Sequence, residues 1–457
     1  MRGRSGFAAL PSGVQPSCVC WPVSVFWDAG NWRGEQCRVP DNGGTLMRFL
    51  FAWEQGGRLG HLSKIVPIAR LLRKRGHGVL FAVKELGTAH DFFQPDGFSY
   101  IQAPLPTGLA RFRREAASFA DILSQAGFGD AALLGGMVRA WQTLFALHKP
   151  DVMLSQYAPI ATQAAGLFGI PCLSLSSGFE SPPETSPYPS FRPWLNLTRE
   201  ALLLTENRLL DNVNNVRGDF GGVPLSYLYQ AIRADVSLLA VLPELDQYPG
   251  RKNARYIGPL FVDDDGETVH WSGQREQKIF VYLIPGAETP LVLEVLDGCG
   301  AEVVAFVPGI AADLREKYSG TGVRIYSEKI KLSGLLSGMT LAINNANLGT
   351  LSATLLSGVP SLCIPTHIEQ LMNSCSMERI GAGIGLKRGQ VTTRFGEVLD
   401  AMLANCCYRN KAIEISIKYA GYGQKQVVGK LTNTLEKMTL YTSCIGRCPA
   451  GTHPKPG

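Results

Sequence analysis

The sequence predicts an α/β protein made of two similar domains, each built on a parallel sheet. Short apolar runs of strand length alternate along the chain with segments in which apolar residues recur at helical spacing. This series occurs twice, and a Gly-, Pro- and Asp-rich segment, residues 243–273, separates the two occurrences. With 457 residues, the chain is long enough for two domains with separate cores. We therefore expect domains at 47–242 and 274–437, joined by a linker at 243–273.

The first strand–helix–strand unit is expected near the start of the first domain. Residues 48–53 form an apolar run, and a glycine-rich loop, residues 55–61, follows it. The next segment predicts a helix to about Arg75, with apolar residues at Leu62, Ile65, Val66, Ala69 and Leu72. Pro67 is expected in the first turn of this helix, where its missing N–H costs little. Residues 78–83 predict the second strand, so we expect a parallel sheet.

The same pattern predicts the remaining elements. A strand at 151–154, a helix at 158–168 and a strand at 171–175 continue the first domain, and a helical stretch follows from 194 to 234. The strands of the second domain are expected at 278–283, 303–307, 323–326, 341–344 and 361–364. A helix near 409–437 is expected to return to the first domain. Because ligands of parallel sheets bind beyond the carboxyl ends of the strands, two such sheets predict a ligand cleft between them.

The two ends of the chain differ in composition from its body. Residues 1–46 show no periodicity and lack the continuous apolar segment of a signal peptide. We interpret them as an extension foreign to the fold, with Met47 as the natural start. Residues 438–457 predict a flexible tail, since they end in a stretch rich in Gly, Pro and Cys. The 11 cysteines show no disulfide pattern, which favours a reducing, cytoplasmic setting.

Hydropathy and charge argue against two classes of protein. No stretch approaches ~18 uninterrupted apolar residues, the length that a membrane-spanning helix needs. The formal net charge of +6 is modest, and the lysines and arginines are scattered instead of gathered in one stripe. This distribution argues against a nucleic-acid partner. A mildly basic surface also suits an anionic substrate or peripheral contact with a membrane.

A polar block in the second domain carries the strongest chemical signal. Residues 344–351, Asn-Asn-Ala-Asn-Leu-Gly-Thr-Leu, place a turn and a helix start after a predicted strand. Free N–H groups near Gly349 and Thr350, at the positive end of the helix dipole, suit a diphosphate, and Thr350 can also cap the helix. Glu369 and Gln370 follow the next strand and can hold sugar hydroxyls. The alternative is an ordinary turn with a Thr cap.

Three further motifs precede this block along the chain: Gly60-His61, Arg75-Gly76-His77 and Tyr256-Ile257-Gly258-Pro259-Leu260. Over residues 47–436 the set resembles the family of glycosyltransferases that use UDP- or dTDP-activated sugars, and it looks closest to bacterial members that modify small molecules or lipids. The resemblance implies the glycosyltransferase B-type fold, in which two Rossmann-like domains face a cleft. It implies that 47–242 bind the acceptor and that 274–437 bind the nucleotide sugar.

The block departs from the family pattern at three positions. The family usually has His at the position of Asn345 and Gly at that of Asn347, and many members have a ribose-holding Glu at that of Ala353. Asn345 still offers a side-chain N–H to a phosphate, but no positive charge. Asn347 adopts a left-handed turn more easily than most residues. We therefore expect altered phosphate binding and no ribose contact at Ala353.

The resemblance also implies catalytic residues in the first domain. It makes His61 the general base that takes the proton of the acceptor hydroxyl, oriented by a carboxylate. We expect Asp121 to be this carboxylate. Glu54, after the first strand, is expected to face the cleft and orient His61 or a substrate hydroxyl. The alternatives are a helix-capping or water-binding role for His61 and a solvated loop position for Glu54. His77 is expected to be structural, and His367 is a candidate for the lining of the donor site.

Small residues mark two loops for close backbone approach to a ligand: Gly56, Gly57 and Gly60 in the first domain and Gly286 in the second. The run Asp263–Asp265 resembles a metal-binding Asp-x-Asp motif, but its place in the linker favours a solvated loop. We expect no metal, because a helix dipole and N–H donors take its place at the diphosphate. We also expect no cofactor, since the nucleotide sugar is a co-substrate.

The resemblance thus implies an inverting, metal-independent transferase that moves a hexose from a UDP- or dTDP-sugar to a hydroxyl of a small molecule or lipid. The acceptor is not identified, because the loops expected to line its site, 84–130 and 176–200, vary freely in such folds. One alternative is a catalytically degenerate partner or activator of another transferase, suggested by Asn345, Asn347 and Ala353. Another is an epimerase or hydrolase that consumes the nucleotide sugar. The oligomeric state is not predicted.

Overall fold

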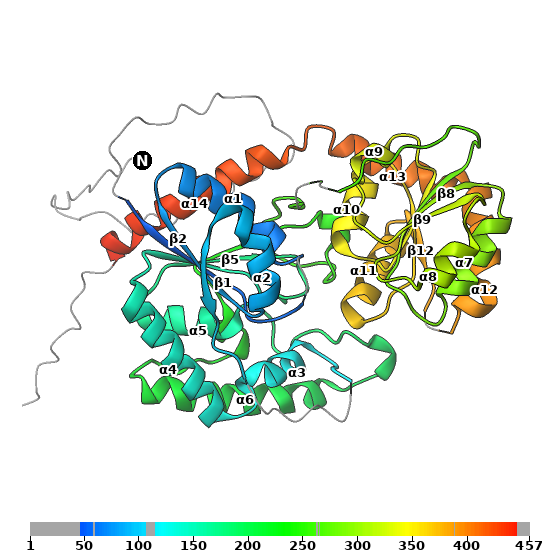
Figure 1. The fold of residues 1–457 in the computed structure, drawn as a ribbon. Coiled ribbons are helices and arrows are strands. Elements are labelled where there is room, and N and C mark those ends of the chain that lie inside the picture. The colour runs from blue at the N-terminus through cyan, green and yellow to red at the C-terminus, as the bar shows by residue number, and fades with distance from the viewer. Residues whose placement is uncertain are drawn as a thin grey trace, which may run out of the picture. The chain divides into compact units, whose positions relative to one another are not determined.

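The computed structural model describes residues 46–445, except 58–59, 107–114, 262–263, 265 and 388. The predicted extension at 1–46 lies outside the described residues apart from its last residue, and so does the part of the predicted tail at 446–457. The described chain contains two six-stranded parallel sheets flanked by helices (Figure 1). Both sheets, and hence the predicted α/β class, are confirmed.

The first sheet has the strand order β3-β2-β1-β4-β5-β6. Its strands are β1 (Arg48–Ala52), β2 (Gly78–Val83), β3 (Ser99–Gln102), β4 (Val152–Ser155), β5 (Cys172–Ser176) and β6 (Val236–Leu239). The four central strands were predicted. The sequence pattern missed β3 and β6, which are four-residue strands at the two edges of the sheet. Both end residues of β3 are exposed, and Ser237 interrupts the apolar residues of β6.

Helices pack against this sheet and close its core. They are α1 (Leu62–Lys74), α2 (Leu86–Phe93), α3 (Phe119–Leu123), α4 (Ala131–His148), α5 (Pro159–Phe168) and α6 (Arg199–Asp219). Large buried side chains such as Trp141 of α4 and Phe119 of α3 pack in this core. The expected place of Pro67 was wrong. Because α1 begins at Leu62, Pro67 lies inside the helix, and its missing N–H leaves the carbonyl of Ser63 without its usual helical partner.

The second sheet repeats the topology of the first, with the order β12-β11-β10-β7-β8-β9. Its strands are β7 (Lys278–Tyr282), β8 (Glu302–Phe306), β9 (Val323–Tyr326), β10 (Leu341–Asn344), β11 (Ser361–Cys363) and β12 (Gly383–Gly385). Numbered within their own half, both sheets read 3-2-1-4-5-6, the order of the Rossmann fold. Only β12, a Gly-Ile-Gly edge strand, escaped prediction in this half.

The helices of the second half are α7 (Thr289–Gly298), α8 (Ala312–Lys317), α9 (Ser333–Leu336), α10 (Leu348–Leu356), α11 (Ile368–Arg379) and α12 (Val391–Ala404). The single helix expected near 409–437 is instead two, α13 (Cys406–Lys418) and α14 (Gln424–Ile445). The second of them, α14, contacts α1 and β4 of the first half.

Ion pairs fasten the returning helix. The carboxylate of Glu436 on α14 lies 2.7 Å from Arg75 Nη1 and 3.0 Å from His77 Nε2. These contacts give His77 the structural place that was expected of it. The helix continues to Ile445, so the first residues of the expected flexible tail are helical. Within the described residues, no helix is both long and apolar enough to cross a membrane.

Candidate active site

A pocket of about 330 Å³ brings together residues from both halves of the chain. Its lining consists of Gly56, Gly57, His61, Ile122, Tyr157, Phe179, His367, Ile368 and Glu369. Four of the predicted site residues, two glycines, His61 and Glu369, therefore meet here, and His367 is with them. The pocket lies beyond the carboxyl ends of β1, β4, β5 and β11, where the topology predicts a ligand.

The glycine loop after β1 makes room for the imidazole of His61. Gly56 has a φ of +77°, and a Cβ built on it would lie 2.2 Å from His61 Nε2. Any other residue at this position would be strained and would displace the imidazole. Lys84 Nζ donates to the Gly56 carbonyl at 2.6 Å, which holds the loop. A Cβ at Gly57 or Gly60 would meet no atom closer than 3.9 Å, so space is not what favours glycine there.

His61 lies between two aromatic rings at the start of α1. Its ring stacks on Trp53 with centroids 6.0 Å apart and lies 5.8 Å from the ring of Tyr157. Its Nδ1 lies 3.1 Å from Nε2 of Gln156. Burial, and then the charges of Lys64 and Lys84 against that of Glu180, lower the pKa of His61 to about 4. The imidazole is therefore neutral at pH 7.

Two polar residues that the sequence did not single out, Gln156 and Glu180, interact with the imidazole of His61. Gln156 follows β4, and its Nε2 also donates to Oε1 of Glu180 at 3.1 Å. Glu180 follows β5 and accepts hydrogen bonds from both the N–H and the Oγ of Ser177. Burial opposes its ionisation, but Lys64, 3.7 Å away, leads the charges and hydrogen bonds that lower the pKa of Glu180 to about 2. Both residues follow strand ends, which was the available signal.

Glu369, the second residue of α11, supplies a carboxyl group to the other side of the pocket. Burial raises its pKa to about 7; the charge of Glu180 adds to this rise and that of Lys64 opposes it. Its neighbour Gln370 is bonded into the fold instead. Gln370 Oε1 accepts from Thr366 N at 2.8 Å, and Nε2 donates to Oδ1 of Asn347 at 2.9 Å. Gln370 thus ties the starts of α10 and α11 together.

The predicted donor block forms the expected turn and helix start, with changed roles. Asn347 is the residue before α10 and has an extended conformation with φ −68°, whereas Ala346 takes the left-handed conformation, with φ +59°. The left-handed turn was therefore predicted one residue too late. Thr350 is the third residue of α10 and lies in its first turn, so it is not the cap. A Cβ at Gly349 would meet nothing within 4 Å, so this helix start has open space.

Asn345 does not offer its amide as predicted, since it is buried and bonded within the fold. Its Oδ1 accepts from the N–H of Ile284 at 2.8 Å, and its Nδ2 donates to the carbonyl of Ile364 at 2.8 Å. These residues follow β7 and β11, the two neighbours of β10. Asn345 therefore braces three adjacent strand ends, a role that its polarity alone did not reveal.

The expected position of Glu54 was also wrong. Its side chain is 1% exposed instead of solvated or facing the cleft. It accepts hydrogen bonds from Trp141 Nε1 at 2.6 Å and from the backbone N–H groups of Ile160 and Ala161, both at 2.9 Å. Burial raises its pKa to about 8 against the lowering by these bonds. Glu54 thus holds the start of α5, where free N–H groups favour a carboxyl group.

Asp121 lies in a capping box at the start of α3. Its Oδ2 accepts from the backbone N–H of Ala117 at 2.7 Å and of Ser118 at 3.4 Å. The next residue, Ile122, lines the pocket. The partnership of Asp121 with His61 stays a prediction, while the structure gives His61 the neighbours Gln156 and Glu180.

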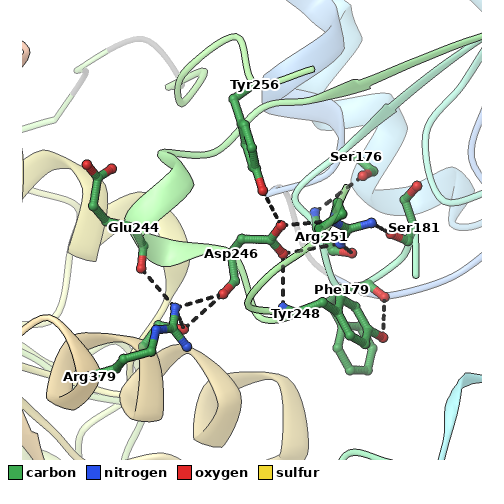
Figure 2. Close-up of polar contacts among 11 residues, drawn as sticks. Ser176, Phe179, Ser181, Glu244, Asp246, Tyr248, Arg251, Tyr256 and Arg379 are labelled. Carbon is green, nitrogen blue, oxygen red and sulfur yellow. Dashed lines mark hydrogen bonds and ion pairs between the residues drawn. The ribbon is translucent and has the colours of Figure 1, made fainter. Parts of the chain in front are cut away.

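A buried ion pair holds the loop that carries Glu180. Figure 2 shows the carboxylate of Asp246 paired with Arg251 Nε at 2.8 Å. The guanidinium of Arg251 also donates to the carbonyls of Gly178 and Ser181, on either side of Glu180 in the chain. From α11, Arg379 Nη2 donates to the carbonyl of Asp246 at 3.0 Å. The cluster therefore joins the loop after β5, the segment at 244–256 and α11.

The other predicted residues have plain structural places. The N–H of Gly286 donates to Thr289 Oγ1 at 2.8 Å in the loop after β7, and a Cβ there would meet nothing within 4 Å. Asp264 accepts from the N–H groups of Leu332 and Ser333 at the start of α9. Asp263 and Asp265 lie outside the described residues. Among the residues that are described, no group of three or more His, Cys, Asp and Glu side chains is arranged to hold a metal ion.

Comparison with known proteins supports the fold. No protein-family model matches the chain. Among curated proteins, it is 22% identical over 259 residues to a PGL/p-HBAD biosynthesis glycosyltransferase of Mycobacterium tuberculosis, a match that covers 53% of this chain. The chain spans 60% of the length of that relative.

The solved structures that it resembles include several glycosyltransferases. Spinosyn rhamnosyltransferase SpnG is 19% identical with a TM-score of 0.59, over 85% of this chain and 100% of that one. SpnG solved with thymidine diphosphate is 18% identical with a TM-score of 0.62, over 84% and 100%. The calicheamicin glycosyltransferase CalG4 is 15% identical with a TM-score of 0.63, over 88% and 99%. The chain therefore has the two-domain B-type fold of the glycosyltransferases, as the resemblance predicted.

Proposed function

We propose that this chain is a glycosyltransferase that moves a sugar from a nucleoside-diphosphate donor to a hydroxyl group of an acceptor, with the pocket described above as its reaction site. One observation carries the proposal. The glycine loop and His61 of the first half line the same pocket as Glu369 of the second half. Polar side chains from two Rossmann-like units thus meet where ligands of such sheets bind.

The start of α10 is the proposed site of the donor diphosphate. Its first N–H groups lack helical partners, and Gly349 leaves space beside them. These dipoles stabilise the charge that develops on the leaving diphosphate. Transfer therefore needs no metal ion in this proposal, and EDTA should leave turnover unchanged. SpnG solved with thymidine diphosphate supports a dTDP- or UDP-hexose as the donor.

The transfer itself is a single displacement. The acceptor oxygen attacks the anomeric carbon as the bond to the diphosphate breaks, so the configuration at that carbon inverts. The acceptor hydroxyl must lose its proton during this step, because its own pKa is too high for attack unaided. We assign this step to His61 and Glu369, which line the pocket from the two halves of the chain.

The lining also indicates what kind of acceptor fits. Ile122, Tyr157 and Phe179 present apolar and aromatic surface to the pocket. Such surface binds an apolar molecule through burial of its area, with the few polar groups setting its orientation. We therefore infer an acceptor with an apolar face next to its hydroxyl, either a small aromatic or polycyclic molecule or a lipid.

A thermal-shift titration of the full chain with UDP, dTDP, GDP and their sugars tests the proposal. A ligand that binds the folded chain raises its melting temperature according to its concentration over its Kd. A shift with one nucleotide selects the donor for an acceptor screen with aromatic alcohols and lipids. A product with the acceptor glycosylated supports the proposal. Consumption of donor without such a product indicates an epimerase or hydrolase.

A specific observation also favours a second candidate, a degenerate relative that serves as a partner of another transferase. Asn345 and Gln370, two residues of the donor block, are bonded inside the fold. A folded chain that shows no thermal shift with any nucleotide would favour this candidate over the transferase.

A further inference from the structure

The side-chain amide of Gln156 lies between His61 and Glu180 and touches both. Its Nε2 is 3.1 Å from His61 Nδ1 and 3.1 Å from Glu180 Oε1. Gln156 Oε1, by contrast, is buried and accepts no hydrogen bond from the described residues. A buried polar atom without a partner is rare and needs a physical reason.

The carboxylate of Glu180 supplies that reason. An ionised carboxylate only accepts hydrogen bonds, so the amide atom next to it must be the NH₂ group. The opposite orientation would place the carbonyl oxygen of Gln156 against the negative charge of Glu180. The contacts of Glu180 stabilise its ionised form. Ser177 donates to both carboxylate oxygens, and Lys64 Nζ lies 3.7 Å from Oε1. The orientation of the Gln156 amide is therefore determined by Glu180.

The orientation of the Gln156 amide in turn determines which ring nitrogen of His61 carries the proton. The two hydrogens of the Gln156 NH₂ point at Glu180 and at His61 Nδ1, so Nδ1 must accept. A neutral imidazole with an accepting Nδ1 carries its proton on Nε2. Nε2 lies on the ring edge next to Gly56, in the pocket lining, and makes no hydrogen bond to any described residue.

We propose that Glu180 and Gln156 are positioning residues that hold His61 in the tautomer with its proton on Nε2, so that His61 donates a hydrogen bond into the pocket. This role of His61 rests on the proposed function of the pocket. It differs from the general-base role that the resemblance implies, because a base facing the pocket needs a free lone pair on Nε2.

The ion-pair cluster of Figure 2 holds the loop that carries Glu180. Arg251 donates to the carbonyls of Gly178 and Ser181, which flank the segment containing Glu180. Gly178 has a φ of +108°, and a Cβ there would lie 2.4 Å from Gln247 Oε1. Glycine at 178 therefore lets this loop approach the segment that carries Asp246. The carboxylate behind Gln156 is thus held through its backbone as well as through Ser177.

With His61 as donor, the acceptor's proton goes to Glu369. The O–H bond of the acceptor breaks, its proton passes to the Glu369 carboxylate, and the oxygen bonds to the anomeric carbon. The bond from that carbon to the diphosphate breaks, and the diphosphate leaves with the electron pair. His61 Nε2–H donates to an oxygen of one of these reactants. Burial raises the pKa of Glu369 most, the charge of Glu180 raises it further, and that of Lys64 lowers it.

Nitrogen-15 NMR of the full chain labelled at histidine measures the tautomer directly. The chain has seven histidines, and loss of one set of signals in His61→Gln assigns His61. The expected result at pH 7 is a protonated Nε2 and an unprotonated Nδ1 that is shifted by an accepted hydrogen bond. A protonated Nδ1 with a free Nε2 would overturn the proposal.

Two variants test the positioning residues. Gln156→Met should move the Nδ1 signal towards that of an imidazole without a hydrogen bond, whereas Gln142→Met, on α4, should leave it in place. Glu180→Gln should let the Gln156 amide turn, so that the Nδ1–H tautomer of His61 also appears. An unmoved Nδ1 signal in Gln156→Met, or an unchanged tautomer in Glu180→Gln, would contradict the assigned roles. The wild-type spectrum decides the main point even if a variant fails to fold.

These spectra need no sugar donor, so they separate the two proposals. If the tautomer is as stated but no nucleotide binds, the proposed function fails and the geometry stands. If transfer occurs with His61 protonated on Nδ1, the proposed function stands and this inference fails.

Discussion

The two halves of the chain place the polar side chains of their predicted site residues differently. In the first half, the imidazole of His61 lies in the pocket lining and is held by Gln156. In the second half, Asn345 lies where the resemblance implies a phosphate ligand, yet both ends of its amide are bonded to neighbouring strand ends. In the proposed function, recognition of the donor therefore rests more on the backbone of α10 than on the side chains of the block.

The largest effect is expected at Glu369. If its carboxylate takes the acceptor's proton, Glu369→Gln should lower kcat by about 10²–10⁴-fold, the usual range for a general base. Glu397→Gln, on the exposed surface of α12, is the matched control and should keep full activity. Initial rates with the identified donor and acceptor give the comparison. Equal rates for Glu369→Gln and wild type would remove Glu369 from proton transfer.

The same assignment fixes the sign of the pH dependence. Burial raises the pKa of Glu369 to about 7, and the group must be ionised to accept a proton. The value of kcat/KM should therefore fall as the pH drops through about 7 and level off above it. His61, with a pKa lowered to about 4, stays neutral over this range and adds no step. A profile flat from pH 5 to 8 would contradict a carboxylate base.

The buried ion pair between Asp246 and Arg251 should contribute strongly to the free energy of unfolding. Asp246 and Arg251 are both buried, so Arg251→Met leaves an uncompensated carboxylate. The free energy of unfolding should fall by about 3–5 kcal/mol. Arg394→Met, which breaks the exposed pair with Glu397, should cost no more than about 1 kcal/mol. Urea unfolding of both variants measures the difference, and similar losses would mean that the buried cluster is not specially stabilising.

His61 should matter for turnover but not for nucleotide binding. Removal of one preorganised hydrogen-bond donor from a reaction site lowers kcat by about 10²–10³-fold. We expect His61→Ala to show a loss of this size, with the thermal shift caused by the nucleotide unchanged. A lost thermal shift with unchanged kcat would place His61 in the nucleotide site instead.

The smallest effect is expected at Asn345, where a variant distinguishes a structural role from a role in phosphate binding. Asn345→Ala leaves the N–H of Ile284 and the carbonyl of Ile364 unpaired, which should lower the free energy of unfolding by about 1–3 kcal/mol. The nucleotide Kd should change little. A large rise in Kd without loss of stability would show that Asn345 contacts the phosphate. The two halves would then not differ in how they use their polar side chains.

The sequence was informative where a long apolar run recurs and silent at the sheet edges. The central strands were predicted, while the edge strands β3, β6 and β12, of only three or four residues each, were missed. Pro67 was misplaced because the sequence does not show how far a helix extends before a proline.

The site was predictable in its location but not in its contacts. His61 and Glu369 were identified because both follow strand ends in recognisable motifs. Glu54 and Glu180 also follow strand ends, yet Glu54 holds a helix start and Glu180 holds Gln156. Which neighbour each carboxylate meets depends on helix and loop packing across the fold, and no local pattern records that.

Calorimetric titration of dTDP and UDP into the full chain, with two variants at Gly349, tests the central claim most directly. Gly349→Asp places a carboxylate at the α10 start, which favours the helix but repels a diphosphate, and Gly349→Ala adds only a methyl group in open space. The account predicts that wild type and Gly349→Ala bind one of the nucleotides and that Gly349→Asp binds it at least about tenfold more weakly, a loss of 1.4 kcal/mol or more. Equal binding by Gly349→Asp, or no binding by the folded wild type, would contradict a diphosphate site at this helix start.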